Sequence, residues 1–313
     1  MALERIAIVW NPSKTEREVL ETGLAAALGD DEREISWWET TVEDPGQKAT
    51  EDALEWGADV IVAAGGDGTV RAVAERLAEP GAGAELAIVP LGTGNLLARN
   101  LDIPLNNPQA AFARALADEA RVIDIGWIET AVDGAPTRQA FAVMAGFGID
   151  AHMIVETDDD LKSKVGWLAY VESLGRAVNA SEVIELRIAV DGGEAVTAAG
   201  HTLMVGNCGM LQGGITLLPD ADPSDGELDL LLLSAEGIAG WLDTLRSFVW
   251  DNGIRRLMGA TDRAESGDTA AHARATSVAV ELPEPRVLEV DGDDLGEVTQ
   301  FTVEIQPGAL RVR

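Results

Sequence analysis

Short apolar runs alternate with helix-favouring stretches in the chain up to Asp124. The runs cover residues 6–10, 60–64 and 85–89, and each ends in a loop rich in Gly, Pro or Asn. Residues 16–28 and 70–77 have helical composition, which predicts helices between and after the strands. This alternation is typical of a mainly parallel sheet covered by helices. Because ligands of such sheets bind beyond the carboxyl ends of the strands, we expect the chemistry in the loops that follow the runs.

The pattern after Asp124 changes to short β-rich segments separated by turns. These segments predict strands over residues 139–145, 183–190, 201–205, 228–233, 276–282 and 286–290, and two interruptions, 158–178 and 240–258, predict helices. Such a pattern is typical of an antiparallel β-sandwich. We therefore predict two domains, an α/β domain over residues 1–125 and a β-sandwich domain over residues 126–313. Whether the last residues return to the first domain is left open.

Composition narrows the classes of protein to which the chain can belong. Hydrophobic residues make up 46% of its 313 residues, which favours a globular protein over a disordered one. No apolar run approaches the roughly 18 residues of a membrane-spanning helix, and the N-terminus does not resemble an export signal. The lone Cys208 excludes a disulfide framework and fits a reducing compartment. We expect a cytoplasmic protein.

The formal net charge of −31 is unusually acidic. Such a surface repels nucleic acid, whose binding depends on neutralising phosphates with Lys and Arg. It also opposes general adsorption to anionic lipid. We interpret the charge mainly as a source of solubility, because net charge governs association rather than fold.

A glycine-rich turn follows the second apolar run and consists of Gly65, Gly66, Asp67, Gly68 and Thr69. Three glycines in four positions let the backbone approach a ligand without Cβ clashes. The helix that starts there directs unpaired N–H groups and a positive dipole end at whatever lies above the turn. The sequence therefore predicts a phosphate site, with the Asp67 carboxylate available to hold a metal ion.

A second glycine turn follows the third apolar run, with Gly92, Thr93, Gly94 and Asn95 after Pro90 and Leu91. Either turn alone is also consistent with an ordinary strand-to-helix connection that holds no ligand. Two such turns in one sheet favour a shared polyphosphate site, to which Thr93 and Asn95 would contribute hydrogen bonds.

Two further turns have both a structural and a chemical interpretation. Residues 11–15, after the first apolar run, form an ordinary Asn-Pro turn on isolated evidence. Asp291, Gly292, Asp293 and Asp294 follow the last predicted strand, where Asp-Gly is a strong hairpin signal. The three carboxylates of this turn allow a second interpretation, in which they supply a general base or metal ligands. The chain contains no Walker loop, no dinucleotide-binding glycine motif and no nucleophile elbow, and its three histidines and one cysteine form no zinc pattern.

The order of these motifs resembles the diacylglycerol kinase and sphingosine kinase superfamily of lipid kinases. The resemblance runs from about residue 5 to the C-terminus and includes Gly146–Ala151, Asp225–Asp229 and the acidic turn after Val290. The turn at residues 65–69 alone is shared with NAD kinases and phosphofructokinases, whereas its combination with residues 90–95 is more specific. The resemblance implies an N-terminal nucleotide domain, a C-terminal domain that accepts lipid, and catalysis in the cleft between them.

Roles for individual residues come from this resemblance. ATP contacts are implied for Asn11, Pro12, Ser13, Lys14, Thr15, Thr40, Thr41, Gly65, Gly66, Asp67, Gly68, Thr69, Val70, Arg71, Gly92, Thr93, Gly94 and Asn95. A Mg²⁺ site of the family maps to Asp222, Asp225 and Glu227. Asp67, together with Mg²⁺, and Asp293, as the base that deprotonates the lipid hydroxyl, are the implied catalytic residues.

The chain departs from the family pattern at two places. The base is usually Glu, and Asp293 is one methylene shorter, which demands a closer backbone, a water relay or the use of Asp294. Arg71 and Ala72 replace the Asn-Glu pair that commonly follows the first glycine turn. The change removes a carboxylate and offers a guanidinium that is able to approach phosphate.

These observations predict an ATP-dependent lipid kinase that phosphorylates a lipid hydroxyl, with diacylglycerol as the first candidate acceptor and phosphatidic acid as the product. The alternatives are a nucleotide-binding regulatory protein with weak or no kinase activity, and a kinase of a sphingoid or soluble acceptor. We expect ATP and a lipid as partners, transient contact with a membrane surface, no nucleic acid, and leave a homodimer open. Residues 241–250 have amphipathic helical spacing, which suits either a bilayer surface or core packing.

Overall fold

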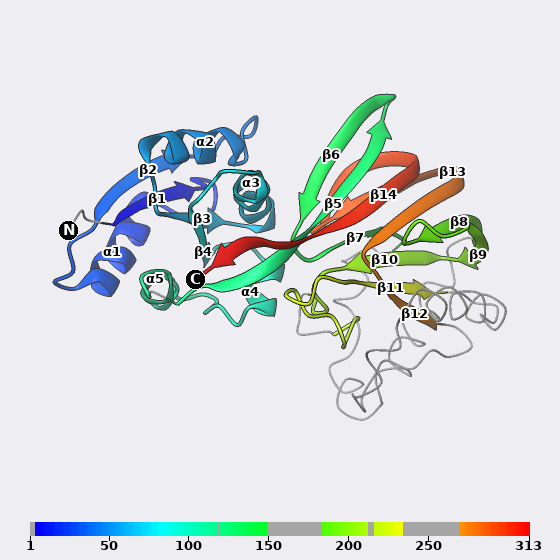
Figure 1. The fold of residues 1–313 in the computed structure, drawn as a ribbon. Coiled ribbons are helices and arrows are strands. Elements are labelled where there is room, and N and C mark those ends of the chain that lie inside the picture. Colours follow the sequence, from blue (N-terminus) through cyan, green and yellow to red (C-terminus); the bar gives the residue numbers. More distant parts are fainter. Residues whose placement is uncertain (1–3, 118, 149–182, 212–215, 234–269) are drawn as a thin grey trace.

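The computed structural model describes residues 4–117, 119–148, 183–211, 216–233 and 270–313. Its first part contains four strands with the register of a parallel sheet, in the order β4-β3-β1-β2. The strands are β1 (Arg5–Trp10), β2 (Glu34–Glu39), β3 (Val60–Gly65) and β4 (Glu85–Pro90). The helices are α1 (Arg17–Leu28), α2 (Gln47–Trp56), α3 (Asp67–Ala78), α4 (Leu96–Asn100) and α5 (Pro108–Ala115). The α2 and α3 helices lie on one face of the sheet and α1 and α5 on the other (Figure 1).

The second part is antiparallel and confirms the predicted β-sandwich-like domain. Its strands are β5 (Arg121–Val132), β6 (Ala135–Phe141), β7 (Met144–Phe147), β8 (Ile184–Val190), β9 (Val196–Gly200), β10 (Thr202–Gly206), β11 (Leu228–Leu233), β12 (Ala270–Ala275), β13 (Ser277–Val290) and β14 (Asp293–Val312). The β13 strand is central because it pairs with β7, β8 and β14. The predicted helices at 158–178 and 240–258 lie outside the described residues.

The C-terminal strand connects the two parts of the molecule. β14 pairs with β13 and β5 in the second domain, and its end lies beside β4 of the first sheet, where Val312 pairs in parallel with Leu86 (Figure 1). Arg313 holds this end in place, because its guanidinium contacts Glu85 at 2.5 Å and Glu4 at 2.7 Å. The last residues thus return to the first domain, while the boundary between residues 125 and 126 stays a prediction.

Two hydrophobic clusters form the core, one in each part. The first gathers buried residues of β1, β3 and β4 with those of the helices, and includes Ile8, Ile61 and Phe112. The second lies between the antiparallel strands and includes Phe141 and Phe301. The continuous apolar runs of β1, β3 and β4 are buried along nearly their whole length, as expected for strands covered by helices on both faces.

The structure corrects three of the predicted elements. The strand predicted over 139–145 is interrupted at Ala142 and Val143, where the backbone N–H groups donate to the Asp291 carboxylate instead of to a neighbouring strand. The two strands predicted over 276–282 and 286–290 are one strand, β13, with a register shift between Glu281 and Arg286. The α3 helix begins at Asp67, three residues before the predicted start, because the glycine turn itself forms its first turn.

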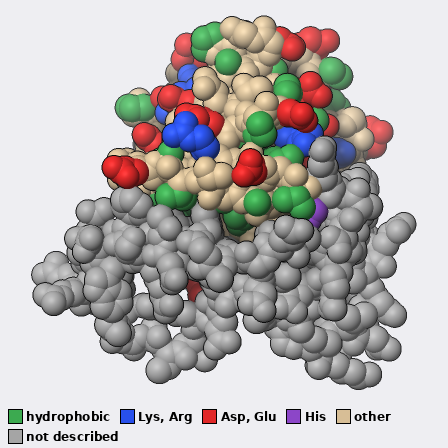
Figure 2. Space-filling model, turned by 90° about the vertical axis from the view of Figure 1, so that its right-hand side faces the viewer, with side chains coloured by type: hydrophobic (Ala, Val, Ile, Leu, Met, Phe, Trp, Pro, Cys, Tyr) green, Lys and Arg blue, Asp and Glu red, His purple; other side chains and the backbone are tan. Residues whose placement is uncertain are grey.

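One face of the described part of the molecule carries mixed charge types. Figure 2 shows one face on which acidic, basic and hydrophobic side chains are interspersed, with no large basic or apolar patch among the residues that are coloured. None of the described helices is long and apolar enough to cross a membrane. Contact with a membrane surface therefore stays a prediction.

Candidate active site

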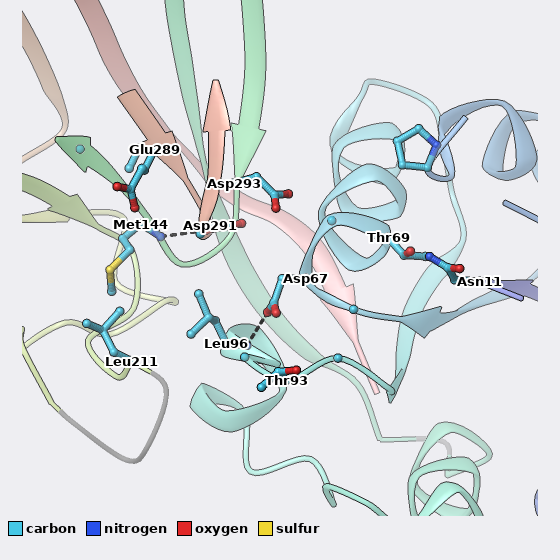
Figure 3. Close-up of a pocket in the computed structure, with 18 of the residues that line it drawn as sticks. Asn11, Asp67, Thr69, Thr93, Leu96, Met144, Leu211, Glu289, Asp291 and Asp293 are labelled. Carbon is cyan, nitrogen blue, oxygen red and sulfur yellow. Dashed lines mark hydrogen bonds between the residues drawn. The ribbon is translucent and has the colours of Figure 1, made fainter. Parts of the chain in front are cut away.

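A cavity of about 440 Å³ lies between the two parts of the molecule. Its lining comes from the loops after β1, β3 and β4 on one side and from β7, β10 and the turn between β13 and β14 on the other. Figure 3 shows Asp67 and Asp293 near its middle, with Met144 and Leu211 toward one end and Asn11 and Thr69 toward the other. The loops in which the sequence predicts the chemistry, those after β1, β3 and β4, therefore meet the β-sandwich domain at this cavity.

The two glycine turns lie against each other at the nucleotide-domain end of this cavity. A Cβ atom added to Gly92 would lie 2.8 Å from the Gly66 Cα, so the backbones are in contact and any side chain at residue 92 would separate them. The Asp67 carboxylate joins the same turns, because its Oδ2 accepts the N–H of Asn95 at 2.9 Å and its Oδ1 accepts the N–H of Leu96 at 2.6 Å. The prediction that the two turns converge is therefore consistent with their geometry.

Burial raises the pKa of Asp67 above its ordinary value, and the nearby negative charge of Asp293 raises it further, although the two backbone N–H groups oppose the shift. The two hydrogen bonds also give the Asp67 carboxylate a structural role, which the sequence does not reveal. It satisfies N–H groups at the start of α4, which would otherwise have no partner within the helix.

Asn95 has a similar local task. It adopts a left-handed conformation (φ 48°), and its side chain accepts from the Gly92 N–H at 2.8 Å and donates to the Gly92 carbonyl oxygen at 2.7 Å. Its amide is therefore used within the second glycine turn, whereas Thr93 is exposed and lines the cavity.

The first loop contributes Asn11 and Lys14 to the cavity lining. Asn11 closes the loop, because its Oδ1 accepts from the N–H of Ser13 at 2.9 Å and from the Ser13 hydroxyl at 2.7 Å. The Asn-Pro turn and the ligand-facing loop are thus compatible interpretations of the same residues.

The structure brings about half of the predicted residues to the cavity. Those that line it are Asn11, Lys14, Gly66, Asp67, Gly68, Thr69, Gly92, Thr93, Gly94 and Asp293. Predicted residues that are not part of its lining are Pro12, Ser13, Thr15, Thr40, Thr41, Gly65, Val70, Arg71, Asn95, Asp222, Asp225 and Glu227. Lining residues that sequence reasoning did not single out are Pro45, Leu96, Met144, Ala145, Met204, Leu211 and Glu289.

The acidic turn is a two-residue hairpin between β13 and β14. Asp291 and Gly292 both have positive φ, 50° and 87°, as a type I′ turn requires, and Val290 pairs with Asp293 across it. The hairpin interpretation of this sequence is therefore correct, and it determines where each carboxylate goes.

The carboxylates of this turn have different environments. Asp291 is buried, and its two oxygens accept the N–H groups of Ala142, Val143 and Met144, each at 2.9 Å. Burial raises the pKa of Asp291 to about 6, against the effect of these N–H groups and of the Arg71 charge. Asp293 is 51% exposed, and its Oδ2 would lie 3.1 Å from a Cβ atom at Gly68, so it extends over the first glycine turn.

The three acids predicted as Mg²⁺ ligands are not part of the cavity lining, and two of them pair with a cation. Asp225 and Glu227 form ion pairs with Arg274, and Asp222 accepts from the N–H of Ser224 at 3.0 Å and from its hydroxyl at 2.6 Å. Among the described residues, no group of three or more His, Cys, Asp or Glu is arranged to hold a metal ion. Asp225 and Glu227 are thus engaged with Arg274, and the Mg²⁺ prediction stays untested.

The fold and the site together define a class of protein, in which an α/β domain with two glycine turns faces a β-sandwich domain across a cavity. Comparison with known families gives the class a name. The diacylglycerol kinase catalytic domain matches residues 5–128, and the YegS C-terminal NAD kinase beta sandwich-like domain matches residues 142–313. The chain belongs to the diacylglycerol kinase and YegS-like family of lipid kinases.

Individual relatives agree with this assignment. A protein of Pseudomonas aeruginosa named "probable lipid kinase YegS-like" is 32% identical over 318 residues, covering 100% of this chain and 95% of that protein. The diacylglycerol kinase of Bacillus subtilis is 30% identical over 247 residues, covering 77% of each chain. The crystal structure of a diacylglycerol kinase from Bacillus anthracis has the same fold, with a TM-score of 0.68 at 21% identity over 100% of this chain and 97% of that one.

Proposed function

We propose that this chain is an ATP-dependent lipid kinase that transfers the γ-phosphoryl group of ATP to a lipid hydroxyl, with diacylglycerol as the acceptor. The observation that carries the proposal is the composition of the cavity. Backbone glycine turns of a phosphate-binding type line one end of it, apolar side chains line the other, and the half-exposed carboxylate of Asp293 lies between them.

The nucleotide end is suited to a polyphosphate. The α3 helix begins in the glycine turn, and the residues of its first turn line the cavity, so the first N–H groups of the helix lie beside it. These N–H groups and the helix dipole favour an anion, and Lys14 in the same lining adds a positive charge. Phosphoryl transfer depends mainly on positioning and electrostatic stabilisation, which a site of this kind provides.

The acceptor end is suited to an apolar molecule. Leu96, Met144, Phe147, Met204 and Leu211 line it and are each mostly withdrawn from solvent. The glycerol backbone and the first acyl carbons of a lipid would bury apolar surface against these side chains. We assign to Asp293 the orientation of the acceptor hydroxyl and the acceptance of its proton, because this carboxylate is half exposed and its Oδ2 lies close to Gly68 in the first glycine turn.

Mg²⁺ would accompany the nucleotide, since this ion is usually bound through one or two carboxylates together with substrate phosphates. When bound, it would offset negative charge on the phosphates.

The test is transfer of radioactive phosphate from γ-labelled ATP by the purified chain. Dioleoylglycerol in mixed micelles, sphingosine and a total lipid extract are offered in parallel, and the products are separated by chromatography. We expect label in phosphatidic acid with dioleoylglycerol. If the label appears only in a sphingoid or a soluble product, the acceptor is that molecule and not diacylglycerol. If the chain binds ATP but transfers phosphate to none of the acceptors offered, it is a nucleotide-binding regulatory protein.

Asp293 variants test the proposed base. Asp293→Asn should lower kcat by about 100-fold or more, because general base catalysis typically contributes 10²–10⁴-fold. Asp293→Glu restores the carboxylate and should keep most of the activity, while Asp294→Asn tests the adjacent acid of the turn. A fully active Asp293→Asn protein would remove this residue from the base role, and loss of activity only in Asp294→Asn would transfer the role to its neighbour.

A further inference from the structure

Arg71 lies on α3, just after the glycine turn, and its guanidinium contacts the β-sandwich domain at several points. Its Nη2 donates to Asp293 Oδ2 at 2.8 Å, and its Nη1 donates to the Val290 carbonyl oxygen at 3.0 Å. The amide of Gln139, with its oxygen turned toward Arg71, accepts from Nη1 at 2.9 Å and from Nη2 at 3.3 Å. The side chain is 14% exposed, so this guanidinium is withdrawn from solvent and held on more than one edge.

These contacts determine where the Asp293 carboxylate lies. Asp293 is 51% exposed and follows a hairpin turn, so without a partner its side chain would sample several rotamers in solvent. The planar guanidinium binds a carboxylate in a defined direction, and Val290 and Gln139 fix the guanidinium in turn. The result is an Asp293 Oδ2 within 3.1 Å of the position that a Cβ atom would have at Gly68, directly over the start of α3.

We propose that Arg71 is a positioning residue, which holds the Asp293 carboxylate over the glycine turn so that the acceptor hydroxyl meets the transferred phosphate there. The proposal rests on the function proposed above, in which Asp293 acts on the acceptor. It also gives a reason for the two departures in this sequence, since the shorter acidic side chain at residue 293 and the arginine at residue 71 contact each other.

The competing role for Arg71 is direct binding of nucleotide phosphate. Three observations favour positioning. The guanidinium already contacts an oxygen of Asp293, of Val290 and of Gln139, and the residue is not part of the cavity lining. Lys14 and the residues of the first turn of α3, by contrast, line the cavity in which an anion would lie.

The experiment measures kcat and KM for ATP in phosphoryl transfer to dioleoylglycerol. The variants are Arg71→Gln, Arg71→Ala, Asp293→Asn and the double variant Arg71→Gln/Asp293→Asn. Arg76→Gln is the matched control, because Arg76 lies on the same helix and pairs with Glu51 at the same distance of 2.8 Å, but does not line the cavity. We expect Arg71→Gln to lower kcat by about 100-fold, as for a displaced catalytic group, with KM for ATP little changed.

Two further readouts separate positioning from a general loss of structure. Guanidinium ion in the assay should restore part of the activity of Arg71→Ala and none of that of Asp293→Asn. Arg71→Gln should cause little additional loss in the Asp293→Asn background, because it acts through that carboxylate. A raised KM for ATP with unchanged kcat would assign Arg71 to the phosphates, and losses that multiply in the double variant would overturn the proposal.

If the wild-type chain transfers no phosphate to any acceptor, the proposed function fails and the pairing is decided by thermal unfolding. Asp293→Asn should then shift Tm in the wild-type background and have a smaller effect in the Arg71→Gln background. An equal shift in both backgrounds would show that Arg71 does not hold Asp293.

Discussion

Asp291→Asn replaces a buried, charged side chain with a neutral one of nearly the same shape. Asp291 is 5% exposed, and it holds the segment from Ala142 to Met144 through three backbone N–H groups. Its pKa is about 6 in the folded protein, compared with an ordinary value of 3.8. The folded state therefore binds a proton more tightly than the unfolded state does.

The sign of the effect on stability follows from this difference. Between the ordinary pKa and about 6, the folded protein carries more of the proton than the unfolded chain, so the free energy of unfolding falls as the pH rises through this range. At pH 7 the ionised carboxylate lowers the stability by about 3 kcal/mol relative to its protonated form, from 1.36 kcal/mol for each unit of pKa. Between a third and a half of this loss, about 1 kcal/mol, occurs between pH 5 and pH 7.

The substitution also has a cost that does not depend on pH. Oδ1 of an asparagine still accepts from Val143 and Met144, but its NH₂ group faces the N–H of Ala142, which loses its partner. Leaving that buried N–H unsatisfied costs about 1–3 kcal/mol. The net change at neutral pH is therefore small, and the pH dependence is the diagnostic quantity.

Thermal unfolding at pH 5 and pH 7 measures this pH dependence of stability. We expect the wild type to lose about 1 kcal/mol, equivalent to about 2–4 °C in Tm, relative to Asp291→Asn between the two pH values. Asp133→Asn is the matched control, because Asp133 occupies the corresponding place in the β5–β6 hairpin with φ 51° but is exposed. The same pH dependence in wild type and Asp291→Asn would refute the account of Asp291 as a buried, ionised structural group.

Two further substitutions test the contact between the glycine turns. Asp67→Asn places an NH₂ group against the N–H of Asn95 or Leu96. We therefore expect the free energy of unfolding to fall by about 1–3 kcal/mol and kcat to fall strongly. A variant that is as stable as the wild type but inactive would instead indicate that the Asp67 carboxylate has a purely chemical role. Gly92→Ala introduces a Cβ atom 2.8 Å from the Gly66 Cα. We expect this contact to destabilise the folded protein by about 1–3 kcal/mol and to weaken the binding of a fluorescent ATP analogue. Unchanged binding would contradict the packing of the two turns.

Local sequence signals were sufficient to predict the glycine turns on the α/β side of the cavity. The strands β1, β3 and β4 are continuous apolar runs, and the glycine turns follow β3 and β4 directly, so strand, turn and helix are all encoded within about a dozen neighbouring positions. Parallel pairing then brings the ends of these strands to one edge of the sheet. The cavity forms there, as the pattern indicates.

The other half depends on contacts between residues far apart in the chain. Arg71 and Asp293 are separated by 222 positions, and Asp291 lies 149 positions from the Ala142 whose N–H it accepts. Met204 and Leu211 reach the cavity only because β10 lies beside β7. Periodicity and turn signals carry no information on contacts between distant residues. For this reason the break between β6 and β7 and the apolar residues that line the cavity were not predicted.

Three of the four carboxylates that line the cavity, Asp67, Asp291 and Asp293, differ in what their oxygens already bind. Asp67 is partly buried and accepts two backbone N–H groups, whereas Asp291 is buried and accepts three, so each of these carboxylates holds a loop in place. Asp293 instead is half exposed and paired with one guanidinium at its side. A carboxylate that accepts a proton from a substrate needs an oxygen free to reach it. By this criterion Asp293 is the acid of the three that is suited to act on the substrate, and the other two are suited to build the surfaces between which it acts.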